Sequence, residues 1–304
     1  MRATGGRGPI VARVTLQQRC SDPRGPLAPR APPFGEELPQ ISPLESAAVS
    51  VRAMDTADRD ALAAKTAEIG EYFALPDAVG DDWRALPRLF DDATVNDFVV
   101  RTRAAIAAST QCAPGEIPLR LAASSFQLGV TARLLSPAVG AAACFGAVPA
   151  LDRRSLRWRP TSTHVPQFAV ADADWFEAPT PRRAADLIAG SLLTEVLAPL
   201  NDTLHTLTSL SPQVTWGNVI SAANGAVTVL SMSRPHHEGA GRALVRALAD
   251  TGPLIGTATF TDGRFVRRSC CLFYQAPGSG LCGDCVLVKE DSGHVATLVQ
   301  RNPR

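Results

Sequence analysis

The sequence predicts an α+β protein, with a mostly helical body and a small C-terminal module that begins with a β-hairpin. Three observations predict this fold class. Apolar residues recur at helical spacing through most of residues 54–255. Two short extended runs flank Asp262-Gly263, a pair of residues typical of hairpin turns. Four of the seven cysteines follow directly, within residues 270–285.

The chain divides into three predicted segments. Residues 1–53 are rich in proline and arginine and show no apolar periodicity, so we expect a disordered tail. Residues 54–255 form the expected helical body, and residues 256–304 form the C-terminal module. Short strands are expected only between residues 155 and 170, where apolar residues alternate with arginines, and in the hairpin.

Serine or threonine followed by proline predicts where three of the helices begin. Such pairs combine an N-cap residue with a proline at the first helical position. They occur at Ser136-Pro137, Thr180-Pro181 and Ser211-Pro212. With the apolar periodicity, they predict helices over about 56–75, 94–109, 119–135, 138–148, 181–198, 212–231 and 237–250.

The composition excludes several classes of protein. With 30 basic and 29 acidic side chains, the chain lacks the basic excess of nucleic-acid-binding proteins. The apolar run at residues 138–148 is shorter than the roughly 20 residues that span a bilayer. It predicts a buried helix, and no transmembrane segment is expected. The N-terminal residues lack the apolar core of a secretory signal. We therefore expect a cytoplasmic protein, whose clustered cysteines bind metal or carry redox chemistry rather than form disulfides.

The four clustered cysteines are the candidate metal ligands. Cys270, Cys271, Cys282 and Cys285 form the pattern C-C-x10-C-x2-C. Four thiolates so close together are typical of a zinc site or an iron–sulfur cluster. Neighbouring side chains in an extended chain point to opposite sides, so the adjacent pair suits two metal ions better than one. The spacing thus favours a [2Fe-2S] cluster and leaves zinc open.

Residues around the cysteines predict a tuned site. Gly283 lies inside the second cysteine pair, where its backbone freedom allows amides to point at sulfur. Arg268, with Arg264 and Arg267, precedes the first pair, and guanidinium groups there would stabilise a negatively charged cluster. An ordinary solvated strand would explain these arginines equally well.

The cysteine segment resembles the C-terminal iron–sulfur motif of the FhuF-type ferric siderophore reductases. The resemblance includes "RSCCLFYQ", "LCGDCVL" and the "TWGNVISAANGAV" segment nearer the middle of the chain. It implies one [2Fe-2S] cluster that passes single electrons to iron(III) in hydroxamate-type siderophores. Trp216 and Asn218, in that middle segment, are candidate substrate-binding residues. Because Trp216 has helical spacing to other apolar residues, a core position is the alternative.

The sequence contains no nucleotide-binding motif, so the electrons must come from an external donor: a ferredoxin, a flavodoxin or a flavin reductase. No catalytic residue is expected beyond the cluster itself. Two other classes of function stay open. One is an iron or redox sensor that acts through a protein partner, and the other is a structural module held together by zinc.

Overall fold

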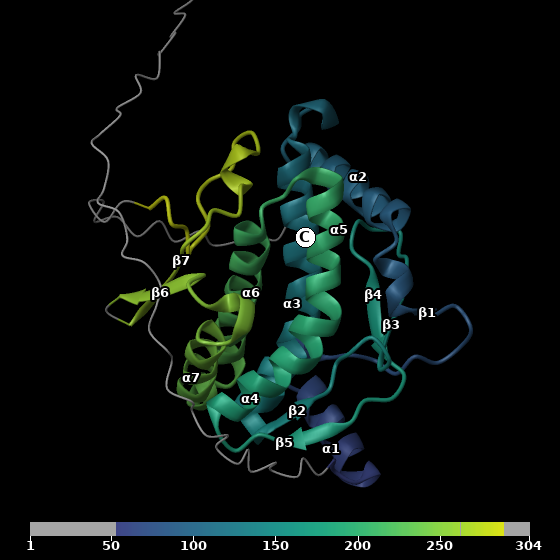
Figure 1. Ribbon diagram of the computed structural model, residues 1–304, viewed down its shortest axis with the longest axis vertical. Helices are drawn as coiled ribbons and strands as arrows, with labels where there is room; N and C mark the ends of the chain where they lie inside the picture. The colour runs from purple at the N-terminus through teal and green to yellow at the C-terminus, as the bar shows by residue number, and fades with distance from the viewer. Residues whose placement is uncertain (1–52, 262, 289–304) are drawn as a thin grey trace, which may run out of the picture. The chain divides into compact units, whose positions relative to one another are not determined.

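The computed structural model describes residues 53–261 and 263–288. Helix α3 (Leu119–Phe145) runs through the middle of the body. In Figure 1, α6 (Pro212–Ser233) and α7 (Glu238–Ala249) lie on one side of α3, and α2 (Asp92–Ser109) lies on the other. The expected mostly helical α+β fold is confirmed.

The remaining helical segments surround this group. They are α1 (Thr56–Ala67), η1 (Glu71–Phe73), η2 (Leu86–Leu89), η3 (Pro114–Glu116), α4 (Pro181–Ile188), η4 (Ala189–Leu197), α5 (Ala198–Thr208), η5 (Pro235–His237), η6 (Gly252–Leu254) and η7 (Phe273–Gln275). The predicted caps of two helices are confirmed. Thr180 accepts a hydrogen bond from the Arg183 amide at 3.2 Å, and Ser211 accepts one from Gln213 at 3.3 Å.

The described strands form three small antiparallel sheets. They are β1 (Arg84–Ala85), β2 (Ala147–Pro149), β3 (Leu156–Arg159), β4 (Gln167–Val170), β5 (Trp175–Glu177), β6 (Ala258–Thr261) and β7 (Arg264–Arg267). The strand orders are β1-β3-β4, β2-β5 and β6-β7. In the predicted hairpin, Phe260 pairs with Phe265, and Gly263 has the positive φ of 78° that the turn requires.

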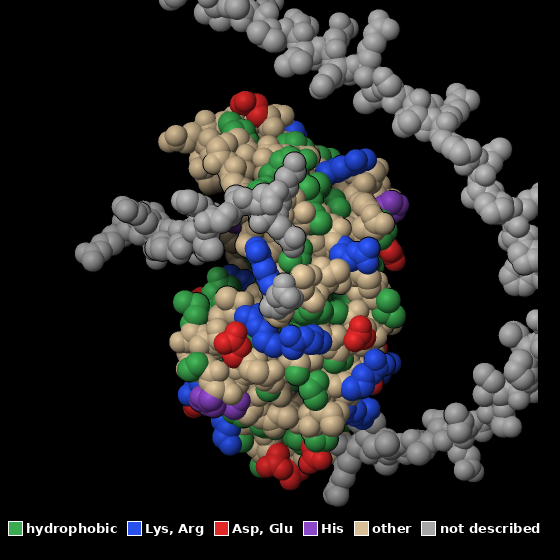
Figure 2. Space-filling model, turned by 90° about the vertical axis from the view of Figure 1, so that its left-hand side faces the viewer, with side chains coloured by type: hydrophobic (Ala, Val, Ile, Leu, Met, Phe, Trp, Pro, Cys, Tyr) green, Lys and Arg blue, Asp and Glu red, His purple; other side chains and the backbone are tan. Residues whose placement is uncertain are grey.

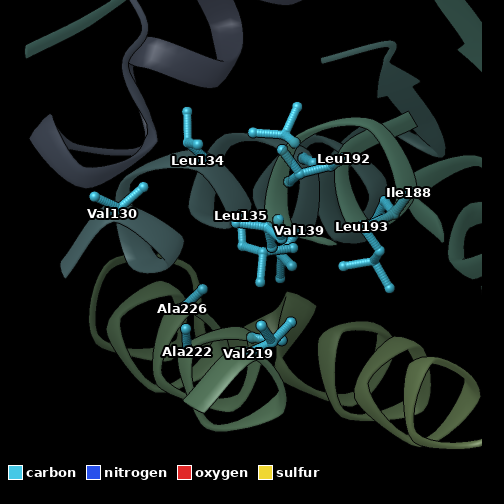
Figure 3. Packing of buried hydrophobic residues seen from close by; sticks show 14 of the residues in the cluster. Val130, Leu134, Leu135, Val139, Ile188, Leu192, Leu193, Val219, Ala222 and Ala226 are labelled. Atoms are coloured by element: carbon cyan, nitrogen blue, oxygen red, sulfur yellow. The ribbon is translucent and has the colours of Figure 1, made fainter. Parts of the chain in front are cut away.

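The core lies mainly between α3 and α6. Figure 3 shows Leu135 and Val139 of α3 pointing toward Val219 of α6. Ala222 and Ala226, also on α6, are small and buried, so the two helices can pack closely. A large buried apolar cluster thus holds the helix against which the cysteine segment packs.

The prediction that a helix begins at Ser136-Pro137 was wrong. Helix α3 continues through Pro137, although proline removes one helical hydrogen bond. The Ser136 hydroxyl donates to the carbonyl of Ala132 at 2.7 Å instead of capping a new helix. Both residues are buried within α3. Packing of this helix therefore outweighs the local Ser-Pro signal for the start of a new helix.

This continuity changes the membrane argument. At 27 residues, with a mean hydropathy of 1.4 in its most apolar window, α3 is long and apolar enough to cross a bilayer. The expectation that no apolar segment is long enough to span a bilayer was therefore wrong about the length of this helix. However, 61% of that window is buried inside the protein, which is the position of a core helix.

The helix predicted over 181–198 was too short. The chain passes from α4 through the wider π-helical turns of η4 into α5, and stays helical to Thr208. Ser209 then ends the helix in a left-handed conformation, with a φ of 53°. The predicted disordered tail, residues 1–53, lies outside the described residues except for Ala53.

Candidate metal centre

The cysteine segment follows β7 and lies beside α6 and α3. The Ser124 hydroxyl, on α3, donates to the carbonyl of Cys271 at 2.9 Å. Ser221, on α6, donates to the carboxylate of Asp284, which lies inside the second cysteine pair. The backbone amide of Arg267 also donates to the carbonyl of Asp284, at 3.2 Å. The two cysteine pairs are thus fastened to the same helical surface.

The four thiols lie together at the edge of the body. Cys271 and Cys285 are buried, whereas Cys270 and Cys282 are partly exposed. The sulfur atoms of Cys271 and Cys282 are 3.7 Å apart. Two sulfurs bound to one tetrahedral metal, with bonds of ~2.3 Å, are about 3.8 Å apart. One cysteine from each pair therefore already has the spacing of two ligands on one metal ion.

Backbone amides point at two of the sulfurs. The amide of Leu272 donates to Cys270 at 3.3 Å, and the amide of Leu287 donates to Cys285 at 3.4 Å. Leu272 has a φ of 69°, a conformation that costs energy for a residue with a side chain. This strained residue directly follows the adjacent cysteines. Amide donors of this kind stabilise metal-bound thiolates.

The thiol pKa values reflect this crowding. The hydrogen bond between the Cys271 and Cys282 side chains lowers the pKa of Cys271 to about 6 and raises the pKa of Cys282. Burial raises the pKa of Cys270, and the nearby thiolate charges of Cys271 and Cys285 raise it further. Cys271 is thus deprotonated more readily than an ordinary thiol, and the thiolate is the form that binds metal.

The donor set fits a [2Fe-2S] cluster. Four thiolates with amide donors to sulfur are the ligands that such clusters use. Within residues 53–261 and 263–288, no three His, Cys, Asp or Glu side chains converge on a single point that could hold one metal ion. The closest sulfurs instead form a pair, Cys271 with Cys282. Which iron each cysteine would bind stays open.

A buried arginine lies directly behind the cysteines. Arg267 is only 1% exposed. Its Nη2 donates to the Oδ1 atom of Asn218 at 2.6 Å, and its Nε donates to the carbonyl of Ser269 at 2.6 Å. The hydrogen bond with Cys282 has the largest influence on the pKa of Cys271, and burial has the largest on that of Cys270; the charge of Arg267 acts to lower both by a smaller amount. Both acceptors of the guanidinium are neutral, so these two hydrogen bonds do not offset its charge.

Asn218 joins Arg267 to the helical core. Its amide nitrogen donates to the Ser124 carbonyl at 3.1 Å, to the Ser124 hydroxyl at 3.0 Å and to Oε1 of Gln127 at 3.0 Å. Gln127 donates in turn to Asn201 at 3.1 Å. A chain of buried polar groups therefore runs from the cysteine segment, across α6, to α3 and α5.

Gly217 allows the cysteine segment to approach α6. A Cβ atom at this position would lie 2.0 Å from Oγ of Ser269 and 3.3 Å from Nη2 of Arg267. Only glycine leaves room for Ser269, which directly precedes Cys270. The Trp216-Gly217-Asn218 segment thus forms the surface on which the cysteine segment rests.

The predicted site residues have different outcomes. The sulfurs of Cys271 and Cys282 approach each other, and Gly283, beside Cys282, has no positive φ. Arg268 is exposed, so its neighbour Arg267 is the arginine that the fold buries behind the cysteines. Asn218 is fully buried and bonded to the protein, so it is not placed to contact a siderophore.

Trp216 is partly exposed, and its role in binding substrate stays a prediction. It lines a cavity of about 440 Å³ together with Arg268 and Ser269. Sequence reasoning missed Ser124 and Gln127. The signal for them in the sequence was that both are polar residues in a largely apolar helix. That signal indicates a buried hydrogen-bond network only when α6 is known to lie beside them.

Comparison with known families agrees with this geometry. Residues 267–287, which contain all four cysteines, match the FhuF 2Fe-2S C-terminal domain. The protein therefore carries a C-terminal iron–sulfur domain of the FhuF type, and the expected resemblance is confirmed.

A particular relative is the ferric siderophore reductase of Escherichia coli (strain K12). The two chains are 29% identical over 105 residues, which make up 32% of this chain and 39% of the relative. The matched region thus spans well under half of the reductase. It supports a distant relationship at the level of the family.

A second family match covers a different part of the chain. Residues 41–171 match the catalytic domain of the ER-bound oxygenase mpaB/B'/Rubber oxygenase family. This range contains α1 to α3 and β1 to β4, and none of the four clustered cysteines. It covers less than half of the chain, and no sequence motif had indicated it.

Proposed function

We propose that this protein is a [2Fe-2S] oxidoreductase that transfers single electrons to iron(III) in hydroxamate-type ferric siderophores. Iron(II) is then released in the cytoplasm. The observation that carries the proposal is the approach of one cysteine from each pair, Cys271 and Cys282, in a segment that matches the FhuF 2Fe-2S domain. The distant similarity to a ferric siderophore reductase supports the choice of substrate.

The chemistry needs little from the protein beyond the metal site. When bound, the cluster supplies a one-electron donor and acceptor. The substrate iron(III) is a hard ion held by anionic oxygens, and reduction to iron(II) weakens that electrostatic binding. No proton transfer or nucleophile is required. The side chains around the site therefore act by position and charge.

The buried residues hold the site in place and set its charge. Arg267 places a positive charge behind the thiolates, and the amides of Leu272 and Leu287 donate to sulfur. Both effects stabilise added negative charge, which favours the reduced state. Asn218 and Ser124 tie this arrangement to the helical core.

The outer side of the cysteine segment suits contact with an external electron donor. Large apolar side chains are exposed here, each by 40–47%, at Phe273, Tyr274, Leu281, Val286 and Leu287. Apolar groups beside a redox centre favour brief docking of a ferredoxin, a flavodoxin or a flavin reductase.

The test is a set of anaerobic visible and electron paramagnetic resonance spectra, recorded before and after dithionite and after addition of a ferric hydroxamate complex. We expect a coloured protein that, once reduced, gives an S = 1/2 signal, and the ferric complex should abolish that signal. Cys285→Ser should remove the cluster. Cys144→Ser, at a half-buried cysteine of α3 outside the site, should keep it.

Other results would favour the remaining classes. A colourless protein with stoichiometric zinc would contradict the proposal and leave a structural module. A reduced cluster that ferric siderophores reoxidise no faster than unrelated acceptors would favour a redox or iron sensor.

A further inference from the structure

A cleft of about 710 Å³ adjoins the second cysteine pair. It lies between α6, α7 and the β6-β7 hairpin, and its volume is typical of a small-molecule site. Gly283 and Asp284, the two residues between Cys282 and Cys285, form part of its wall. A ligand in the cleft would therefore lie directly against the metal-binding segment.

Arginines line the cleft. Arg242 of α7 is held by Asn224 Oδ1 at 2.6 Å and by Glu238 Oε1 at 3.1 Å. The guanidinium of Arg246 lies 5.4 Å from the ring centre of Phe260. Arg264 lines the hairpin side. Figure 2, which views the side where α7 and the hairpin lie, shows Lys and Arg side chains gathered near its middle.

These side chains suit a ligand that combines anionic oxygens with an apolar part. Guanidinium groups donate well to anionic oxygens, and the Phe260 ring offers an apolar contact beside them. Arg242 pairs with Glu238, and the side chains of Arg246 and Arg264 line the cleft beside it. The combination suits a chelate whose metal is wrapped in anionic oxygens joined by short carbon chains.

Three glycines leave the cleft wall open. At Gly225, Gly263 and Gly283, an added Cβ atom would meet nothing within 4 Å. A bulky ligand can therefore come close to the backbone at each of these positions. The smaller cavity beside Trp216 has a volume of about 440 Å³ and a single arginine, Arg268.

We propose that the cleft formed by α6, α7 and the hairpin binds the ferric siderophore, in preference to the cavity beside Trp216. This inference rests on the proposed function and names the substrate site for it. One electron passes from the reduced metal centre across the Gly283-Asp284 wall to the chelated iron(III), which becomes iron(II). No covalent bond to the protein forms or breaks, and the external donor restores the electron.

The test fills the cleft without disturbing the metal centre. In Gly225→Phe, the new side chain projects from α6 into open space, and replacing a helical glycine does not weaken the helix. Gly239→Phe is the matched control, because Gly239 is also helical and open but does not line the cleft. The ligand is a gallium(III) trihydroxamate complex, which has the charge of the iron complex but cannot be reduced. Its binding to the holoprotein is measured by calorimetry.

We expect Gly225→Phe to weaken gallium-complex binding at least tenfold. It should slow single-turnover reoxidation of the reduced protein by the ferric complex to a similar extent, with an unchanged visible spectrum. Gly239→Phe should match wild type. Arg246→Gln should weaken binding several-fold, because it removes a donor to anionic oxygen.

Two results would overturn the inference while the proposed function stands. In the first, wild type reduces the ferric complex and Gly225→Phe binds and reacts equally well. In the second, Gly225→Phe slows reduction of the cluster by a donor protein but not its reoxidation, which makes the cleft the donor site. A wild-type protein that never transfers electrons to the chelate overturns the function itself, and with it the proposed occupant.

Discussion

Nη2 of Arg267 donates to Oδ1 of Asn218 at 2.6 Å, and both side chains are buried. This contact joins the strand that enters the cysteine segment to the middle of α6. It places a positive charge inside the protein with neutral groups as its side-chain and backbone acceptors. We therefore expect Arg267 to influence both the stability of the fold and the charge around the cysteines.

Removing the charge of Arg267 should make the cluster harder to reduce. At an effective dielectric constant of about 20, unit charges about 8 Å apart interact by about 2 kcal/mol, equivalent to about 90 mV for one electron. We expect Arg267→Met to shift the midpoint potential to more negative values by several tens of millivolts, measured by an EPR redox titration. Arg267→Lys should shift it less, because the charge stays.

Arg268→Met is the matched control for this prediction. Arg268 is adjacent in sequence but exposed, so water screens its charge and its loss should change the potential little. Equal shifts in Arg267→Met and Arg268→Met would contradict a specific role for the buried guanidinium.

Asn218→Ala should destabilise the protein strongly. It removes the acceptor of a buried charge and the donor to Gln127 and Ser124. Losing a buried hydrogen bond to a charged group costs about 1.5–3 kcal/mol in the free energy of unfolding. Urea denaturation followed by circular dichroism measures the loss.

Asn224→Ala is the control on the same helix. It also removes the acceptor of an arginine, but at a partly exposed site, so it should cost below about 1 kcal/mol in the free energy of unfolding. Similar losses in the two variants would argue against the buried network.

A larger residue at position 217 should disturb the metal centre and spare the helical body. In Gly217→Val, the added atoms would collide with Ser269 and press on Arg267, so the segment leading to Cys270 must move away from α6. We expect lower iron content per chain with little change in helical circular dichroism. Gly225→Val, where an added Cβ meets nothing within 4 Å, should keep full iron content. Normal iron content in Gly217→Val would show that the close approach is not needed.

Removing the cluster should loosen the cysteine segment and leave the helices folded. The large core cluster contains none of the four cysteines, so its burial energy does not depend on metal. Hydrogen exchange should speed up at the amides of Leu272 and Leu287, which lose thiolate acceptors held in place by the metal. Exchange in the middle of α3 and α6 should stay slow. Loss of protection across these helices would instead mean that the metal centre supports the whole fold.

The sequence alone predicted the fold class, most helices, the hairpin and the four candidate metal ligands, because these depend on local signals. Apolar periodicity, proline next to a capping residue, Asp262-Gly263 and the cysteine spacing can each be read within a few residues. Where a local signal competed with packing, prediction failed. The Ser136-Pro137 pair is a helix start by composition, yet it lies inside α3 because the surrounding helix is buried on all sides.

Only the tertiary structure decided which arginine lies behind the cysteines, what Asn218 does and where a ligand can approach. Arg267 and Arg268 are adjacent residues of the same type. Alternation along β7 buries Arg267, the last residue of the strand, whereas Arg268 follows the strand and is exposed. Asn218 is separated by 49 residues from Arg267 and by 94 from Ser124, so its partners are defined only when α3, α6 and the hairpin pack. The cleft beside Gly283 likewise exists only between packed elements. The physical reason is that burial and charge pairing depend on distance in space, which no local pattern encodes.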